Sequence, residues 1–158
     1  MNYFVTSDTH FNHHNIIEYT NRPFKHVDEM DRVLIDNWNS VVNWDDTVFH
    51  LGDFSFGNPD YYKSRLNGNI IFIKGNHDDK KLTRIQNLHF AFGMHTIFMT
   101  HDPTQAYITP FKEILCGHVH GLFKEIKSKD KYIINVGVDV WNYTPVNIET
   151  IIGRFNKR

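Results

Sequence analysis

The sequence predicts an α/β fold in its first half, followed by a second half that is richer in strands and forms an antiparallel or mixed sheet. Short runs of β-branched and aromatic residues recur along the chain, and the first three alternate with helical patterns. The 158 residues, 41% of them hydrophobic, are enough for one core. Because we find no repeat, low-complexity tract or linker, we expect a single domain over residues 1–158.

Seven segments have the composition of buried strands: residues 3–6, 47–51, 70–74, 96–100, 114–117, 132–136 and 146–151. Between the first two, apolar residues at helical spacing predict an amphipathic helix from Met30 to Val42, with Asp28 as its N-cap. A shorter helix should begin at Asn58-Pro59, because proline suits the first helical position, and end at the turn 67–69. The later strands follow each other more closely, which allows a second sheet.

Composition narrows the classes of function. The net charge of -1 lacks the broad basic field of a protein that binds nucleic acid by its backbone, so a small substrate is favoured over nucleic acid. The chain has no signal-peptide pattern, and no segment approaches the ~18 apolar residues of a membrane span. Its single cysteine, Cys116, suits a reducing compartment. We therefore expect a soluble cytoplasmic protein without a membrane partner, while the oligomeric state stays undetermined.

Polar motifs stand at or just after the ends of five predicted strands. In open α/β sheets, ligands bind outside the carboxyl ends of the strands, so we expect these motifs to meet in one crevice. Glycines in three of them would permit a close approach of the backbone. The motifs are Asp8-Thr9-His10, Gly52-Asp53, Gly75-Asn76-His77-Asp78, His101 and Gly117-His118-Val119-His120.

The side chains of these motifs form a mixed oxygen and nitrogen ligand set for a metal. Two carboxylates, four imidazoles and one amide suit Mn best, with Fe, Zn or Ni as alternatives, and do not suit Ca²⁺ or a thiolate-type zinc site. Such a set exceeds what one cation needs, and a carboxylate could bridge two cations about 3.5–4 Å apart. The expected ligands are Asp8, His10, Asp53, Asn76, His101, His118 and His120.

The five motifs, in this order, resemble those of the calcineurin-like metallophosphoesterases. The resemblance implies a four-layer αββα sandwich with two mixed sheets and a metal site at the carboxyl ends of the strands. It assigns one cation to Asp8, His10, Asp53 and His120, and the other to Asp53, Asn76, His101 and His118, so that Asp53 bridges them. The stretch 54–57 lacks the arginine of the protein Ser/Thr phosphatase branch, and the small size resembles the compact bacterial and phage branch.

The expected function is therefore hydrolysis of a phosphodiester or small organic phosphate by water that two divalent cations activate. The resemblance suggests that His77 acts as general acid or transition-state donor and that Asp78 orients its ring. An unperturbed histidine pKa near neutrality suits that role. His13 and Arg22 are weaker candidates for contact with the substrate phosphate.

Two alternatives stay open. One is a nuclease acting on DNA or RNA, because DNA-repair nucleases share this metal set. The other is a non-catalytic metal-binding scaffold, as in the retromer subunit that resembles this fold but has lost ligands.

Overall fold

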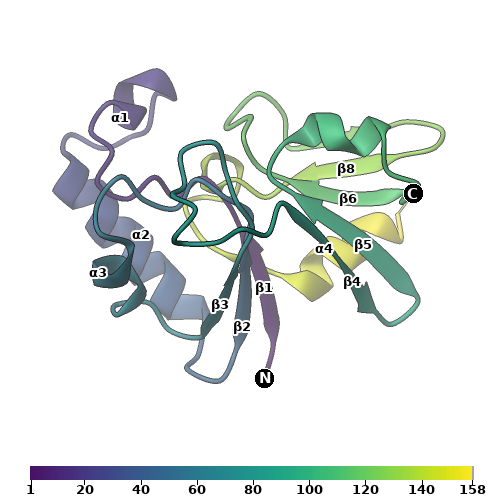
Figure 1. Ribbon diagram of the computed structural model, residues 1–158, viewed down its shortest axis with the longest axis horizontal. Helices are drawn as coiled ribbons and strands as arrows, with labels where there is room; N and C mark the ends of the chain where they lie inside the picture. The colour runs from purple at the N-terminus through teal and green to yellow at the C-terminus, as the bar shows by residue number, and fades with distance from the viewer. Residues whose placement is uncertain (158) are drawn as a thin grey trace.

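The computed structural model describes residues 1–157 and contains two packed β-sheets (Figure 1). The first sheet has the order β3-β2-β1-β9, in which β1, β2 and β3 are parallel and β9 is antiparallel. The second has the order β4-β5-β6-β8-β7, in which β5, β6 and β8 are parallel and both edge strands are antiparallel. The predicted α/β class with two mixed sheets is confirmed.

The strands are short, with two to six residues each. The strands are β1 (Tyr3–Thr6), β2 (Thr47–His50), β3 (Asn69–Phe72), β4 (Asn87–Phe92), β5 (His95–Thr100), β6 (Glu113–Cys116), β7 (Glu125–Lys127), β8 (Tyr132–Asn135) and β9 (Val146–Asn147). The helices are α1 (Ile16–Tyr19), α2 (Val27–Val41), α3 (Pro59–Lys63) and α4 (Ile148–Phe155), with 3-10 helices η1 (Pro103–Tyr107) and η2 (Val138–Val140). None of the described helices combines the length and the apolar character that crossing a bilayer would need.

Strands β1 and β2 of the first sheet are buried on both faces, which explains their continuous apolar runs. Phe4 and Val48 pack under α2 and α3, whereas their neighbours Val5 and Phe49 face the second sheet. The outer face of the second sheet packs against η1, where Ala106 is fully buried. The layers are thus helices, sheet, sheet and a thin outer layer that contains η1.

Several predicted elements differ from the structure. Residues 148–155 form α4 rather than a strand: Ile148, Ile151 and Phe155 are buried at helical spacing, and the Asn147 side chain caps the helix by accepting from the Glu149 N–H at 2.8 Å. Helix α2 begins after His26, so the expected cap Asp28 lies inside its first turn. Strands β4 and β7, at the edges of the second sheet, were not predicted, and neither was the four-residue helix α1.

The two sheets come together at the carboxyl ends of their parallel strands. Ser7 forms a bridge with Gly137, and the Val138 N–H donates to the Ser7 carbonyl at 3.0 Å, which joins the end of β1 to the segment after β8. The Gly117 N–H donates to the His101 carbonyl at 3.0 Å and joins the ends of β6 and β5. The motif residues therefore share one edge of the sandwich.

Candidate metal centre

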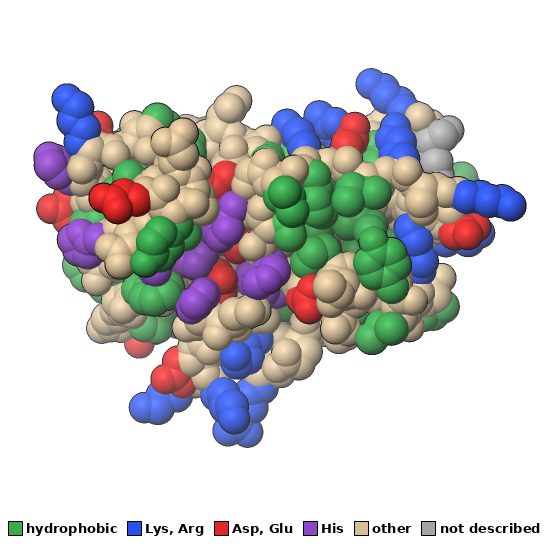
Figure 2. Space-filling view, turned by 90° about the horizontal axis from the view of Figure 1, so that it is seen from above, with side chains coloured by type: hydrophobic (Ala, Val, Ile, Leu, Met, Phe, Trp, Pro, Cys, Tyr) green, Lys and Arg blue, Asp and Glu red, His purple; other side chains and the backbone are tan. Residues whose placement is uncertain are grey.

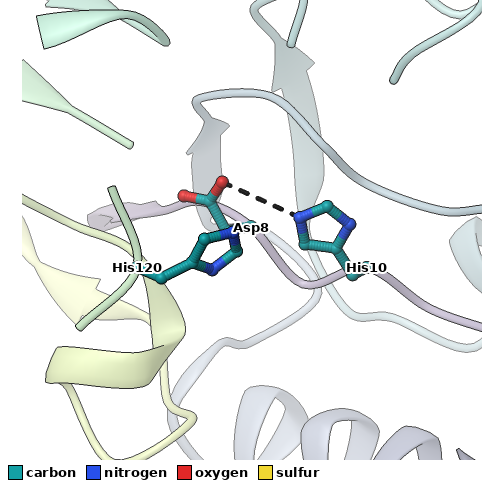
Figure 3. Close-up of side chains that lie close together, drawn as sticks. All are labelled: Asp8, His10 and His120. Carbon is teal, nitrogen blue, oxygen red and sulfur yellow. Dashed lines mark ion pairs between the residues drawn. The ribbon is translucent and has the colours of Figure 1, made fainter. Parts of the chain in front are cut away.

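Two groups of ligand side chains lie at this edge. One group is Asp8, His10 and His120, and the other is Asp53, His101 and His118; within each, the ligand atoms lie within 4.8 Å of one another. Figure 3 shows the first group, in which the three side chains come from two segments of the chain. Figure 2 shows a cluster of histidine side chains gathered in a hollow of the surface, with acidic side chains between them. The structure thus brings six of the predicted ligands together.

Asp53 lies between the two groups. Its Oδ2 is 3.5 Å from Nε2 of His10 and 3.5 Å from Nε2 of His101. Two ligand atoms that are each about 2.1 Å from one cation, at an angle of roughly 90–110°, are separated by about 3.0–3.4 Å. The spacing therefore fits ligand atoms that share a cation better than a direct hydrogen bond.

His10 gives the sharpest test of whether the residues fit a metal. Its side chain is 2% exposed, and neither ring nitrogen has a hydrogen-bond partner among the described residues. Buried polar groups without partners are rare in folded proteins, because each costs free energy. A cation bound at Nε2 would remove part of this cost, so the donor set fits a divalent metal.

The ring orientation of two other histidines is fixed by hydrogen bonds at Nδ1. His101 Nδ1 lies 2.7 Å from the Leu51 carbonyl, which only accepts, so this nitrogen carries the proton. His120 Nδ1 lies 2.9 Å from Oδ2 of Asp139. Both arrangements engage Nδ1 and so leave Nε2 as the ring nitrogen that could bind a metal.

Many ligands have a backbone conformation that L-residues avoid. Five of the seven predicted ligands have positive φ, and such angles are uncommon outside glycine and concentrate at functional sites. All five residues lie in the loops that follow β1, β2 and β6. The residues and angles are Asp8 (59°), His10 (50°), Asp53 (57°), His118 (72°) and His120 (47°).

Glycines next to the ligands let neighbouring strand ends approach each other. A Cβ at Gly75 would overlap the Asp53 carboxylate, and one at Gly117 would overlap Ser7 Oγ and Asp8 Oδ2. Any side chain at these two positions would therefore displace a ligand.

Asp139 and Arg22 support the first ligand group from behind. Arg22 Nε and Nη2 donate to the Asp139 carboxylate at 2.9 and 3.0 Å, and the guanidinium also donates to the carbonyls of Asp8 and Thr9 at 2.7 and 3.0 Å. With a contact to Met30 Sδ, all five N–H groups of Arg22 have acceptors. Arg22 is therefore buried behind the motif loop, not free to bind a substrate phosphate as the sequence suggested.

Sequence reasoning missed Asp139. The only indication in the sequence is a charged residue between Val138 and Val140, three positions after the end of the predicted strand 132–136. The side chain is 5% exposed, and it links Arg22 to His120. Burial raises the pKa of this carboxyl, but its hydrogen bond to His120 and the positive charge of Arg22 outweigh that effect and hold the pKa below its usual value.

Burial and neighbouring charges set the protonation of the ligands. Burial lowers the pKa of His10 to about 2 and keeps its ring neutral, and it raises the pKa of the Asp8 carboxyl. For Asp53, burial is outweighed by His101 and by the His77 backbone N–H, so its pKa falls. For His101, burial is outweighed by Asp53 and Asp8, which raise its pKa to about 9. The carboxylates of Asp8 and Asp53 thus favour a positive charge next to the His101 ring.

His77 is exposed at the rim of the metal centre. Its ring lies 5.8 Å from the His10 ring and 5.2 Å from the ring of Phe56, measured between centroids. His13 packs edge-on against Phe56, with ring centroids 3.9 Å apart, and its Nδ1 accepts from the Ile16 N–H at 2.9 Å. Phe56, which is 48% exposed and was not singled out from the sequence, therefore forms a wall of the site with His13 and His77.

Asp78 is buried behind the site, whereas Asn76 is exposed at its surface. Asp78 is buried, and its two oxygens accept from the N–H groups of Asp53, Phe54 and Gly75 at 2.7–2.9 Å. Within residues 1–157, no hydrogen bond joins Asp78 to the His77 ring, so Asp78 fixes the backbone of two motif loops instead. Asn76 is exposed and lines a cavity beside His101.

Residues 1–152 match the model of the calcineurin-like phosphoesterase superfamily domain. The chain therefore belongs to this superfamily. It is similar to an uncharacterized protein of Methanocaldococcus jannaschii, with 40% identity over 98% of this chain and 91% of the relative.

Solved structures share the fold at lower identity. A protein of unknown function from Aquifex aeolicus superposes with a TM-score of 0.75 and 24% identity, over 96% of this chain and 98% of its own. Vps29 from Entamoeba histolytica, solved with zinc, gives 0.55 and 20%, over 87% and 74%. An archaeal phosphodiesterase gives 0.51 and 20%, over 87% and 84%. At these low identities the superpositions show that the fold is shared.

Proposed function

We propose that the protein hydrolyses a phosphodiester or a small organic phosphate, using two divalent cations held by the two ligand groups and bridged by Asp53. The observation that carries the proposal is the position of Asp53 Oδ2, at 3.5 Å from Nε2 of both His10 and His101. Asn76, which lines the cavity beside His101, completes the second set. Two cations held there would neutralise charge on the phosphoryl oxygens and lower the pKa of a water for in-line attack.

His77 is the residue that we assign to the leaving group. Its ring is exposed, and its backbone N–H donates to Asp53 Oδ1 at 2.9 Å, which ties the His77 loop to the bridging carboxylate. A phosphate ester leaves as a poor alkoxide that benefits from a proton, and histidine supplies one near neutral pH. His77 therefore donates to the ester oxygen, while Phe56 and His13 limit the space around the leaving group.

The buried charges behind the site hold the ligands in place. Asp78 ties the loop after β2 to the loop after β3, and Asp139 orients His120 with support from Arg22. Carboxylates in such positions typically change metal affinity by about 10–100-fold when removed. These residues act through the ligands and do not contact the substrate.

The test is a panel of paired aryl esters, p-nitrophenyl phosphate and bis(p-nitrophenyl) phosphate, assayed with Mn²⁺, Ni²⁺, Zn²⁺ or Mg²⁺ after chelation and reloading. We expect turnover that requires added metal and is lost in His10→Gln. His26→Gln is the matched control, because His26 is exposed and lies outside both ligand groups. Protein that keeps two cations but hydrolyses neither ester would overturn the proposal and favour the metal-binding scaffold.

A further inference from the structure

Two cavities meet beside the second ligand group. The first, of about 400 Å³, contains Asn76 and His101 together with the amide side chains of Gln86, Asn87 and Gln105. The second, also about 400 Å³, is lined by Lys74, Lys80, Arg84 and Gln86. Lys74 and Gln86 line both, so the two cavities are adjacent, and we call them together the basic groove.

The loop that carries the basic side chains is anchored to the fold. The Lys74 N–H donates to the Ile85 carbonyl at 2.7 Å, and Thr83 Oγ1 donates to the Phe72 carbonyl at 2.9 Å. Leu82 packs against the core under the first sheet. The lysine and arginine side chains therefore extend from a loop whose two ends are hydrogen-bonded to each other next to β3.

The lining of the groove contains more basic than acidic side chains. Among the ion pairs of the described residues, none involves Lys74, Lys80 or Arg84. The acidic residue of the first cavity, Asp102, uses its oxygens to accept from the backbone N–H and hydroxyl of Thr104. Figure 2 shows lysine and arginine side chains gathered immediately below the histidine cluster. This concentration of positive charge contrasts with the chain's net charge of -1.

We propose that the basic groove binds a second phosphate of the substrate, so that the preferred substrate is a phosphate ester that carries a further phosphate group beyond the scissile one. Lysine and arginine are the side chains that bind phosphate most strongly, and the groove has the size of a site for a small organic ligand. Gln86, Asn87 and Gln105 supply neutral donors and acceptors for the part of the substrate between its two phosphates. This inference rests on the proposed function, because the first phosphate is the one at the metal centre.

The test compares two esters that differ only in a second phosphate: the p-nitrophenyl ester of thymidine 5′-phosphate, and the same ester with a 3′-phosphate. We expect kcat/KM to be about tenfold or more higher for the 3′-phosphorylated ester, mainly through KM. In the variant Lys80→Gln/Arg84→Gln this ratio should fall toward one. In the control variant Lys129→Gln/Lys157→Gln, which removes the same charge from exposed positions outside both cavities, the ratio should persist.

A binding measurement separates this inference from the proposed function. Thymidine 3′,5′-bisphosphate should bind the metal-loaded protein more tightly than thymidine 5′-phosphate, and the double substitution in the groove should remove the difference. Equal binding of the two nucleotides to the wild-type protein would overturn the inference even if both esters were hydrolysed. A difference that survives the groove substitutions would overturn it as well. Failure to hydrolyse either ester would count against the proposed function alone.

The phosphate could belong to a small nucleotide or to a nucleic acid strand. A thymidine oligonucleotide distinguishes them, because binding that engages several phosphates weakens steeply with salt, with a slope of about -0.7 per phosphate for single strands. If the salt dependence of oligonucleotide binding has the same slope as that of bisphosphate binding, the groove binds a single additional phosphate. A much steeper slope extends it to a nucleic acid backbone.

Discussion

Replacing Arg22 with methionine should destabilise the fold by about 3–5 kcal/mol, the usual loss when one partner of a buried ion pair is removed. The Arg22 side chain is 0% exposed and the Asp139 side chain 5%, so solvent screening does not reduce this figure. Methionine retains the apolar stem but leaves the Asp139 carboxylate with only its His120 contact and the carbonyls of Asp8 and Thr9 without the Arg22 donors. Since small domains are stable by roughly 5–15 kcal/mol, the loss is a large share of the total.

Urea unfolding followed by far-UV circular dichroism measures this change, in the presence of a chelator so that bound metal does not contribute. Lys63→Met is the matched control, because its ion pair with Asp60 at 2.8 Å is exposed (41% and 80%), and the control should lose less than about 1 kcal/mol. If Arg22→Met does not fold, Asp139→Asn provides the milder test, with an expected loss of about 1.5–3 kcal/mol. Losses that match the control for both variants would refute the role that we give to this buried pair.

Three further changes test the centre itself. Asp53→Asn should weaken both cation sites by at least about tenfold, because the same oxygen faces both ligand groups, and two tightly bound Mn²⁺ ions in calorimetry would contradict the bridge. His77→Ala should keep both metals yet lose roughly 10²–10⁴-fold in kcat, and unchanged turnover of an ester with a poor leaving group would rule out its role. Gly117→Ala should lower the unfolding temperature and the metal content, since its Cβ would overlap Asp8; Gly121→Ala, which has nothing within 4 Å, should do neither.

The position of the metal centre could be predicted because it depends on local sequence and on sheet geometry. Each motif follows a buried run, and the carboxyl ends of parallel strands share one edge, so a set of short patterns was enough to place Asp8, Asp53 and His101 together. The glycine positions are explained in the same way, since Gly75 and Gly117 each face a ligand of another strand.

The supporting residues could not be predicted with the same tools. Arg22 and Asp139 are 117 positions apart, and nothing local to either indicates the other. The error at residues 148–151 has a related cause: a short apolar run fits a strand and a helix equally, and only the packing of Ile151 and Phe155 against the core selects the helix. Edge strand β4 was missed because its residues alternate between exposed and half-buried, a pattern that also occurs in loops.

The backbone strain at the ligands explains why the support behind them is so extensive. A left-handed conformation costs an L-residue roughly 1–2 kcal/mol, and five ligands adopt it. Hydrogen bonds beyond the strand ends balance this cost: the N–H groups of Asp8 and His10 donate to the carbonyls of Gly52 and Asp53 at 3.0 Å, and Asp78 accepts from the N–H of Asp53 at 2.7 Å. These hydrogen bonds join the strand ends to one another and limit the freedom of the loops that carry the ligands, which is the physical advantage of building the centre on strained but tightly bonded strand ends.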